Sequence, residues 1–264
     1  LGSVNGQIII PSQHGGDLYY NDDLFKKNHE RSYDYFISWI KSRNKNEKNI
    51  LVLPSPYFSK ALDSYNQKDN RVILVGTKTL KFNVGFDGWF INSKEVLIYR
   101  DSKIKLINFL ITRENKNFFY RPHLSSPQNA LPDYNYFLKI FPDLKIIKSN
   151  LHNEIRKCKI LILDHPGTTL SLAFSINVPF LLYFKNLKYF GIDNSSPMIN
   201  EFIKYNILFT DLNKFKLHYD SIIDNPQLWW NSNEIQNIRK LFLDNYAFCD
   251  PNWRAKWINE LTKI

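Results

Sequence analysis

The sequence predicts an α/β fold in which a mainly parallel sheet carries helices on both faces. Short apolar runs alternate with amphipathic segments, as they do in chains built from repeated strand–helix units. The run Ile160 to Asp164 is apolar at four consecutive residues, which is typical of a central parallel strand covered on both sides. After Pro226 the pattern becomes helical, so we expect the chain to close with helices.

Eight short apolar runs are expected to be strands. They are Gln7 to Pro11, Asn49 to Leu53, Arg71 to Gly76, Asn117 to Arg121, Leu144 to Ile147, Ile160 to Asp164, Phe180 to Phe184 and Ile207 to Phe209.

Five segments have helical signals. Apolar side chains three and four residues apart predict a helix over Tyr134 to Phe141. Asn150 can cap a helix that runs through Lys157, and Thr168 or Thr169 can open one that reaches Ile176. The two C-terminal helices are expected over Asn233 to Tyr246 and Asn252 to Thr262.

A domain boundary is expected between Ser55 and Asn70, where prolines and a polar run separate two groups of strands. Residues 1–60 would then be the end of one α/β domain. Residues 61–264 would form a fuller second domain that includes the C-terminal helices. The two cysteines, Cys158 and Cys249, lie far apart without metal-ligand spacing, so we expect free thiols and a reduced, cytoplasmic setting.

The segment Asp164 to Ala173 has the strongest functional signal. It combines a buried strand, a turn that contains Gly167, the hydroxyls of Thr168 and Thr169, and a helix. Ligands of open α/β sheets bind beyond the carboxyl ends of the strands, and a helix N-terminus favours an anion there. The segment therefore predicts a phosphate site, although either threonine can equally be an ordinary helix cap.

Two further loops follow predicted strands. After the strand that ends at Arg121, the Arg121 guanidinium could pair with a diphosphate and His123 could donate to a phosphate or a ribose. The loop Gln13-His14-Gly15-Gly16 follows the first strand, and its glycines permit positive φ or close approach of a ligand. Histidine is the residue type suited to general acid–base chemistry near neutral pH, which makes His14 a candidate base.

Two carboxylates near that loop, Glu30 and Asp34, are further acid–base candidates, although they can also be plain surface charges. The sequence contains no P-loop, dinucleotide GxGxxG, HExxH, GxSxG or DxD motif. We therefore expect a site that needs no metal and no cofactor and holds an anionic donor through backbone amides and basic side chains.

Several short motifs occur in the order found in a family of bacterial surface-polysaccharide transferases, which the chain resembles. They are the QHGG loop, Tyr33 to Trp39, Arg121 to His123, Asp164 to Thr169 with Leu172-Ala173 and Asn177 to Pro179, and the closing Phe242 to Tyr246 and Trp253 to Leu261. The chain is more distantly similar to Kdo transferases, polysialyltransferases and teichoic-acid glycerophosphotransferases.

That resemblance implies a GT-B-like fold, made of Rossmann-like domains, and a glycosyltransferase that uses a nucleotide-activated donor, with CMP favoured over UDP or GDP. It implies that the nucleotide and its phosphates are held by Arg121, His123, Asp164, His165, Gly167, Thr168 and Thr169. The acceptor-side loop Gln13, Gly15 and Gly16 would face them, with His14 or Glu30 removing the proton of an acceptor hydroxyl.

The sequence departs from the family pattern in two places. Ser171 or Leu172 stands where a glutamate is expected after the hydroxyl turn, and the acceptor-side domain is short, as in a fragment or a reduced domain. The alternatives of a CDP-alditol phosphotransferase and of a non-catalytic sugar- or nucleotide-binding module therefore stay open.

The net charge of +10 has three competing explanations. It can reflect the codon usage of an AT-rich genome, a basic cleft for the donor, or peripheral attraction to anionic lipid at the inner face of the cytoplasmic membrane. The expected partners are a nucleotide-sugar donor and a glycan or lipid-linked acceptor. The basic residues are scattered and no nucleic-acid-binding fingerprint is present, so we expect no nucleic acid.

Overall fold

The computed structural model describes residues 6–15, 32–41, 49–77, 79–80, 93–124, 130–131, 133–187 and 197–264. The chain divides into two compact units. Unit 1 contains Leu1–Ser64, Gly167–Asn177 and Gln236–Ile264, and unit 2 contains Tyr65–Pro166 and Val178–Ile235.

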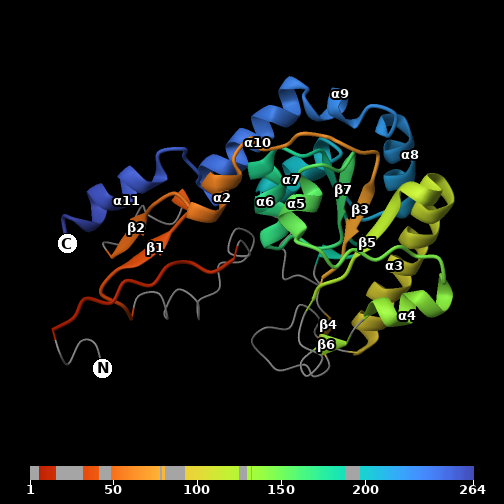
Figure 1. The fold of residues 1–264 in the computed structure, drawn as a ribbon, viewed down its shortest axis with the longest axis horizontal. Coiled ribbons are helices and arrows are strands. Elements are labelled where there is room, and N and C mark those ends of the chain that lie inside the picture. Colours follow the sequence, from red (N-terminus) through yellow and green to blue (C-terminus); the bar gives the residue numbers. More distant parts are fainter. Residues whose placement is uncertain are drawn as a thin grey trace. The chain divides into compact units, whose positions relative to one another are not determined.

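Unit 2 is built on a parallel sheet of five strands in the order β5-β3-β7-β8-β9 (Figure 1). These strands are β3 (Val72–Val75), β5 (Phe118–Arg121), β7 (Ile160–Leu163), β8 (Phe180–Tyr183) and β9 (Leu208–Phe209). A parallel bridge between Tyr120 and Ile146 places the segment around Ile146 at the edge of the sheet, next to β5. When β3, β5, this segment, β7, β8 and β9 are numbered 1 to 6 in chain order, they lie across the sheet in the order 3-2-1-4-5-6, which is the doubly wound order of Rossmann-like domains.

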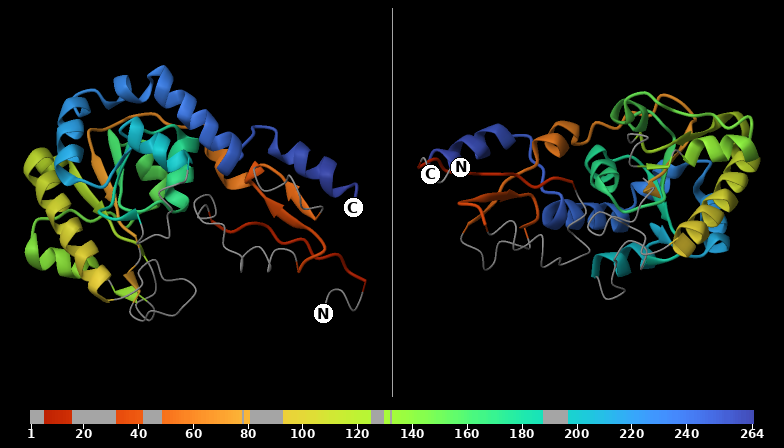
Figure 2. Two further views of the ribbon diagram at one scale, coloured as in Figure 1. Left: turned by 180° about the vertical axis from the view of Figure 1, so that it is seen from behind. Right: turned by 90° about the horizontal axis from the view of Figure 1, so that it is seen from below.

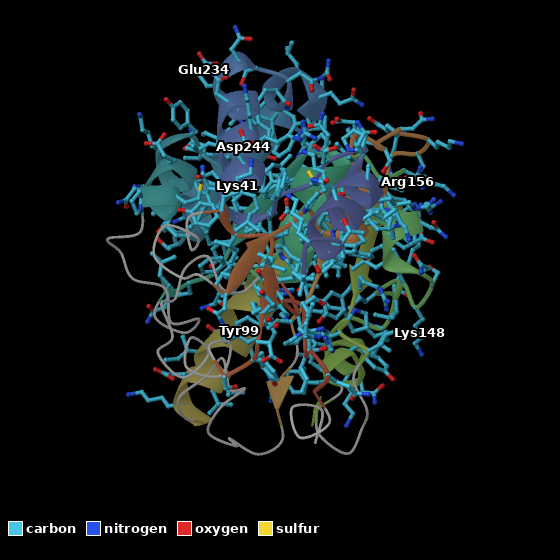
Figure 3. The ribbon with its side chains drawn as sticks, turned by 90° about the vertical axis from the view of Figure 1, so that its left-hand side faces the viewer. Lys41, Tyr99, Lys148, Arg156, Glu234 and Asp244 are labelled. Atoms are coloured by element: carbon cyan, nitrogen blue, oxygen red, sulfur yellow. The ribbon has the colours of Figure 1, made fainter. Side chains whose placement is uncertain are left out.

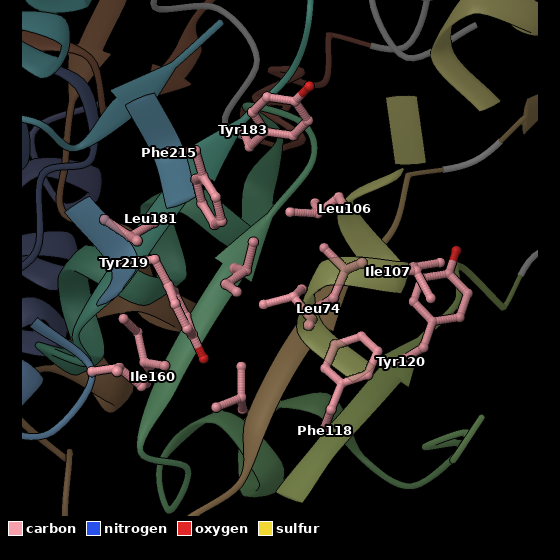
Figure 4. Packing of buried hydrophobic residues seen from close by; sticks show 14 of the residues in the cluster. Leu74, Leu106, Ile107, Phe118, Tyr120, Ile160, Leu181, Tyr183, Phe215 and Tyr219 are labelled. Atoms are coloured by element: carbon pink, nitrogen blue, oxygen red, sulfur yellow. The ribbon is translucent and has the colours of Figure 1, made fainter. Parts of the chain in front are cut away.

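The central strands are buried at every residue, as a parallel sheet covered on both faces requires. One face packs on three helices: α3 (Ser93–Glu114), α4 (Asp133–Ile140) and α8 (Leu212–Ile222). Figure 4 shows this core, in which Leu106 and Ile107 of α3 meet Leu74 of β3.

The other face of this sheet looks toward α5 (Leu151–Ile155) and α7 (Pro197–Lys204), and the view from behind agrees (Figures 1 and 2). The remaining elements of unit 2 are the 3-10 turn η4 (Asn115–Asn117), the antiparallel pair β4 (Thr79–Leu80) and β6 (Ala130–Leu131), and α9 (Pro226–Trp230). Side-chain caps define two helix starts: Asn150 accepts from the amide of Asn153 at α5, and Asp211 accepts from that of Lys214 at α8.

Unit 1 contains the parallel pair β1 (Phe36–Ser38) and β2 (Ile50–Val52), with α2 (Pro56–Ala61), α6 (Thr168–Ile176), most of α10 (Asn233–Tyr246) and α11 (Trp253–Leu261). The rings of Phe174 on α6 and Phe242 on α10 stack with centroids 4.5 Å apart. Arg239 ties the same helices together, because its guanidinium donates to the carbonyl of Phe174 at 2.7 Å. Asp244 of α10 pairs with Lys41 at 3.4 Å (Figure 3).

Most predicted elements are confirmed, with ends that shift by one or two residues. The strand predicted over Gln7 to Pro11 is not formed as such. The segment only runs beside β1, where Ser12 bridges Ile37 and the amide of Ile37 donates to the carbonyl of Pro11 at 2.9 Å. The segment Leu144 to Ile147 contributes only the bridge at Ile146. Periodicity did not identify β1, α2, α3, α7, α8 or α9. Both cysteines are free thiols, as expected.

Replacing Leu106 with alanine should lower the free energy of unfolding by about 2–5 kcal/mol, because this side chain is fully buried in the core and leaves a cavity. The matched control is Leu217→Ala on α8, where 74% of the residue is exposed and a change within about 0.5 kcal/mol is expected. Urea denaturation followed by circular dichroism measures both, and equal losses would contradict the assignment of this core.

Candidate functional site

The candidate site lies at the carboxyl ends of β3 and β7, where the chain order of the strands reverses. In open α/β sheets this switch point is where ligands bind. Thr77 follows β3 and Asp164 follows β7, and the amide of Thr77 donates to Oδ1 of Asp164 at 2.8 Å. The two strand ends are therefore joined directly across the switch point.

Asp164 accepts hydrogen bonds from three further groups. Tyr99 Oη lies 2.5 Å from Oδ2, Lys103 Nζ lies 2.8 Å from the same oxygen, and His165 Nδ1 lies 3.0 Å from Oδ1. With the Thr77 amide these donors saturate a carboxylate that is only 2% exposed. Asp164 thus orients the groups around it, and its own contact with a donor stays a prediction.

Lys103 is the centre of this buried network. It lies on α3 and is 2% exposed, whereas Lys148 extends into solvent at the surface (Figure 3). Besides Asp164, the Lys103 ammonium contacts Asp133 Oδ2 at 2.9 Å and Tyr120 Oη at 3.3 Å. Tyr120 Oη donates in turn to Asp133 at 2.7 Å. Helix α3, helix α4 and the ends of β5 and β7 are therefore linked by one set of polar contacts.

The charges of the network stabilise one another. Burial alone would raise the pKa of Asp164, but the Lys103 charge and the bond to His165 bring that pKa down from 3.8 to about 2. Burial alone would lower the pKa of Lys103, but Asp133 and Asp164 hold it above its ordinary value. Burial and the nearby carboxylates raise the pKa of Tyr99 and of Tyr120, so both stay neutral donors.

Gly76 makes room for this arrangement. A Cβ at this position would lie 2.3 Å from the hydroxyl oxygen of Tyr120, so only glycine lets the end of β3 approach that ring. The amide of Gly76 donates to the carbonyl of Arg121 at 3.0 Å, which keeps β3 and β5 paired beyond their last strand residues.

Arg121 ends β5 and is half-buried. One guanidinium nitrogen donates to the carbonyl of Ile147 at 3.3 Å, and its buried Nε has no hydrogen-bond partner among the described residues. Burial lowers the pKa of Arg121. His123 is exposed two residues later. The structure therefore places both predicted residues at the carboxyl edge, and their contact with a donor stays a prediction.

His165 is oriented by its neighbour. Because the Asp164 carboxylate can only accept, Nδ1 of His165 carries the hydrogen of their bond, and Nε2 is the atom left to act on a ligand. Two residues later the chain reaches Gly167, the N-cap of α6, which has no side chain with which to cap the helix. Thr168 is exposed and Thr169 is partly exposed.

The N-terminal loop in unit 1 has a clear structural role. The buried amide of Gln13 accepts from Ser38 Oγ at 2.8 Å and donates to the carbonyl of Gly15 at 3.1 Å. Gly15 has φ +83°, the left-handed conformation that its glycine was expected to permit. His14 is exposed between them. Gly16 and Glu30 lie outside the described residues.

Asp34 accepts the backbone amide of Ile9 at 2.9 Å, so this carboxylate fixes the extended segment beside β1. Among the described residues, no group of three histidines, cysteines, aspartates or glutamates could hold a metal ion. Within the same part of the chain, no helix has the length and apolar character required to cross a membrane. The expectation that the site needs no metal stays a prediction.

A sequence profile described as the LIC12162 family transferase matches residues 3–261, nearly the whole chain. The chain belongs to the LIC12162 family of transferases. No curated protein matches the sequence. The resemblance to a transferase family is thus confirmed at this level, whereas the similarity to Kdo transferases and polysialyltransferases stays a resemblance.

Solved structures share the fold. The wall teichoic acid polymerase TagF is 15% identical and has a TM-score of 0.55, over 97% of this chain and 68% of that chain; TagF was also soaked with CDPG. MnaA from S. aureus, solved with UDP, is 13% identical with a TM-score of 0.58, over 99% and 69%. MurG from Acinetobacter baumannii is 8% identical with a TM-score of 0.53, over 100% and 69%. The predicted α/β, GT-B-like fold is confirmed.

Lys103, Asp133, Tyr99 and Tyr120 are not among the site residues predicted from the sequence. A signal for Lys103 is present: Tyr99, Lys103, Leu106 and Leu110 are spaced four, three and four residues apart, so the lysine lies on the apolar face of α3. A lysine on such a face must be paired when the helix is buried.

Replacing Lys103 with methionine should destabilise the protein by about 3–5 kcal/mol, because it leaves buried carboxylates without their counter-charge. Lys105→Met is the matched control, since Lys105 is two residues away on the same helix, forms an exposed pair with Asp101 and should cost less than about 1 kcal/mol. Chemical denaturation at neutral pH compares them. Similar losses in the two variants would show that the network is not a charge-paired core.

The depressed pKa of Asp164 predicts a specific pH dependence. Because the folded-state pKa is about 2 and the ordinary value is 3.8, this carboxylate contributes stability above pH 4 that is lost as pH falls toward 2. The contribution is about 2 kcal/mol. Denaturation at pH 6, 4 and 3 should show a steeper fall for the wild type than for Asp164→Asn. Parallel curves would contradict the pairing.

Proposed function

We propose that the chain contains the donor-binding part of a glycosyltransferase that moves a sugar from a nucleotide-activated donor to a hydroxyl of a bacterial surface glycan. The observation that carries the proposal is the connection from β7 to α6. It starts at the switch point of the Rossmann-like sheet of unit 2 and leads directly to the N-terminus of α6, whose N-cap residue is a glycine without a capping side chain. Membership of a transferase family and the GT-B-like fold support it.

The proposed chemistry breaks the bond between the anomeric carbon of the donor sugar and a phosphate oxygen. The amides at Gly167 to Thr169, Arg121 and the Nε2 atom of His165 would stabilise the negative charge that develops on the departing phosphate. The acceptor oxygen forms the new bond to that carbon, and His14 is proposed to take its proton. Asp164 would act by orienting His165.

The nucleotide is proposed to be CMP-linked, as the resemblance implies. Two neighbours in fold widen the choice, since MnaA was solved with UDP and TagF was soaked with CDPG. The TagF likeness also favours one second candidate, transfer of an alditol phosphate from a CDP-activated donor. The two reactions differ in the product, because only the second leaves a phosphate between donor residue and acceptor.

In a thermal-shift assay with CMP, CDP, UDP, GDP and ADP, a cytidine nucleotide should raise the melting temperature of the protein more than the other nucleotides do. A ligand that binds only the native state stabilises it by mass action, by about 2.7 kcal/mol at a hundred times Kd. A larger shift with UDP or GDP would show that the donor contains uridine or guanosine instead of cytidine. No shift with any nucleotide would count against the donor site and favour a binding module for another ligand.

The double variant Thr168→Ala, Thr169→Ala should bind the preferred nucleotide about tenfold more weakly, because it removes two hydroxyl donors at the α6 N-terminus. Thr112→Ala, an exposed threonine on α3, serves as the matched control and should bind as the wild type does. Isothermal titration calorimetry gives both affinities. An unchanged affinity in the double variant would contradict a phosphate site at the N-terminus of α6.

A further inference from the structure

Unit 2 contains a second polar feature at the carboxyl edge of its sheet, beyond the ends of β8 and β9. It is a hollow of about 180 Å³ whose walls come from α3, from the residues after β8 and from the start of α8. None of the residues predicted from the sequence to bind a donor lines it.

The floor of the hollow contains the hydroxyl group of a tyrosine. Tyr183, the last residue of β8, is 3% exposed, and among the described residues its Oη has no hydrogen-bond partner. Its ring packs against Phe215, and Figure 4 shows the hydroxyl turned away from the apolar side chains. Burial raises the pKa of Tyr183 to about 12, so the hydroxyl stays a neutral donor. The oxygen is not among the fully buried polar atoms that lack a partner, so it is accessible from the hollow, where its O–H can donate to a ligand or to water.

The rim supplies further hydrogen-bonding groups. Lys185, Thr210 and Asn213 line the hollow and are exposed. Among the described residues, none of these three side chains makes an internal hydrogen bond or ion pair.

The formal charges of the lining residues cancel. Lys105 is paired with Asp101 at 2.8 Å, and Lys185 is balanced by Asp211, whose carboxylate caps α8. An anion would meet two aspartates there. The hollow therefore suits a neutral ligand with several hydroxyl groups better than a phosphate.

The size of the hollow limits its occupant. Sites for drug-sized ligands usually have about 300–1,000 Å³. A hollow of about 180 Å³ is too small for a nucleotide sugar but fits a single ring.

We propose that this hollow is a subsite for one neutral sugar ring, with Tyr183 Oη donating to a ring hydroxyl and Asn213 and Thr210 contacting the others. The inference rests on the proposed function only in taking the substrate to be a sugar. The ring can belong to the donor or to the acceptor glycan, and the chemistry of the subsite is the same for both.

The test is saturation-transfer NMR titration of the full chain with glucose, galactose, N-acetylglucosamine and N-acetylmannosamine. At least one should bind, and Tyr183→Phe and Asn213→Ala should each weaken that binding about fivefold or more. Because Tyr183 Oη has no partner in the described part of the chain, Tyr183→Phe should leave the melting temperature unchanged. Tyr219→Phe is the matched control: it removes a bond to Glu114 at 2.8 Å, so it should lower the melting temperature and leave sugar binding intact.

The proposal is overturned if no sugar binds, if Tyr183→Phe binds as the wild type does, or if that variant loses stability. Sugar binding without any nucleotide binding would uphold the subsite and reject the proposed donor site, so the two failures can be told apart. A Tyr183→Phe variant that binds nucleotide sugars more weakly, yet free nucleotides normally, assigns the ring to the donor. A variant impaired only toward an oligosaccharide assigns it to the acceptor.

Discussion

The ammonium of Lys103, held between the carboxylates of Asp133 and Asp164, is the interaction on which the carboxyl edge of unit 2 depends. A buried charge is tolerated only when it is paired and hydrogen-bonded, and each member of this set has its partners. Such a network adds little net stability compared with well-packed apolar residues, but losing one member is costly. We therefore infer that it mainly fixes how α3, α4 and the end of β7 fit together.

The buried network around Lys103 extends to the candidate site through Asp164. One carboxylate joins the ends of β3 and β7 through the Thr77 amide and also binds Nδ1 of His165, which fixes the orientation of that ring. A rigid edge of this kind suits a binding site, because groups locked by their own hydrogen bonds do not have to be ordered when the ligand arrives. Beyond β8, by contrast, the hydroxyl of Tyr183 makes no hydrogen bond to the described residues, so it is available to a ligand in the proposed sugar subsite.

Sequence reasoning worked best where a segment is uniform in character. The runs that became β3, β7 and β8 are apolar at every position, and few structures other than a central parallel strand bury such a short run. It failed for α3, whose 22 residues are rich in charges and show only a weak apolar stripe. It failed again for β1, whose three residues are too few to show a period. Nothing in the sequence indicated that the Gln13 side chain accepts a hydrogen bond from Ser38 Oγ, whereas its place in an acceptor-side loop stays a prediction.

The sequence by itself determined the alternation of strands and helices, the turn from β7 through Gly167 into α6, and the residues placed after each strand, because these follow from local pattern and chain order. The tertiary structure alone decided the strand order, and with it the position of the switch point. It also decided which charges meet: Lys103 and Asp133 are 30 residues apart and lie on different helices. Periodicity describes the faces of one element, whereas such a contact depends on how separate elements pack, and no local signal contains that information.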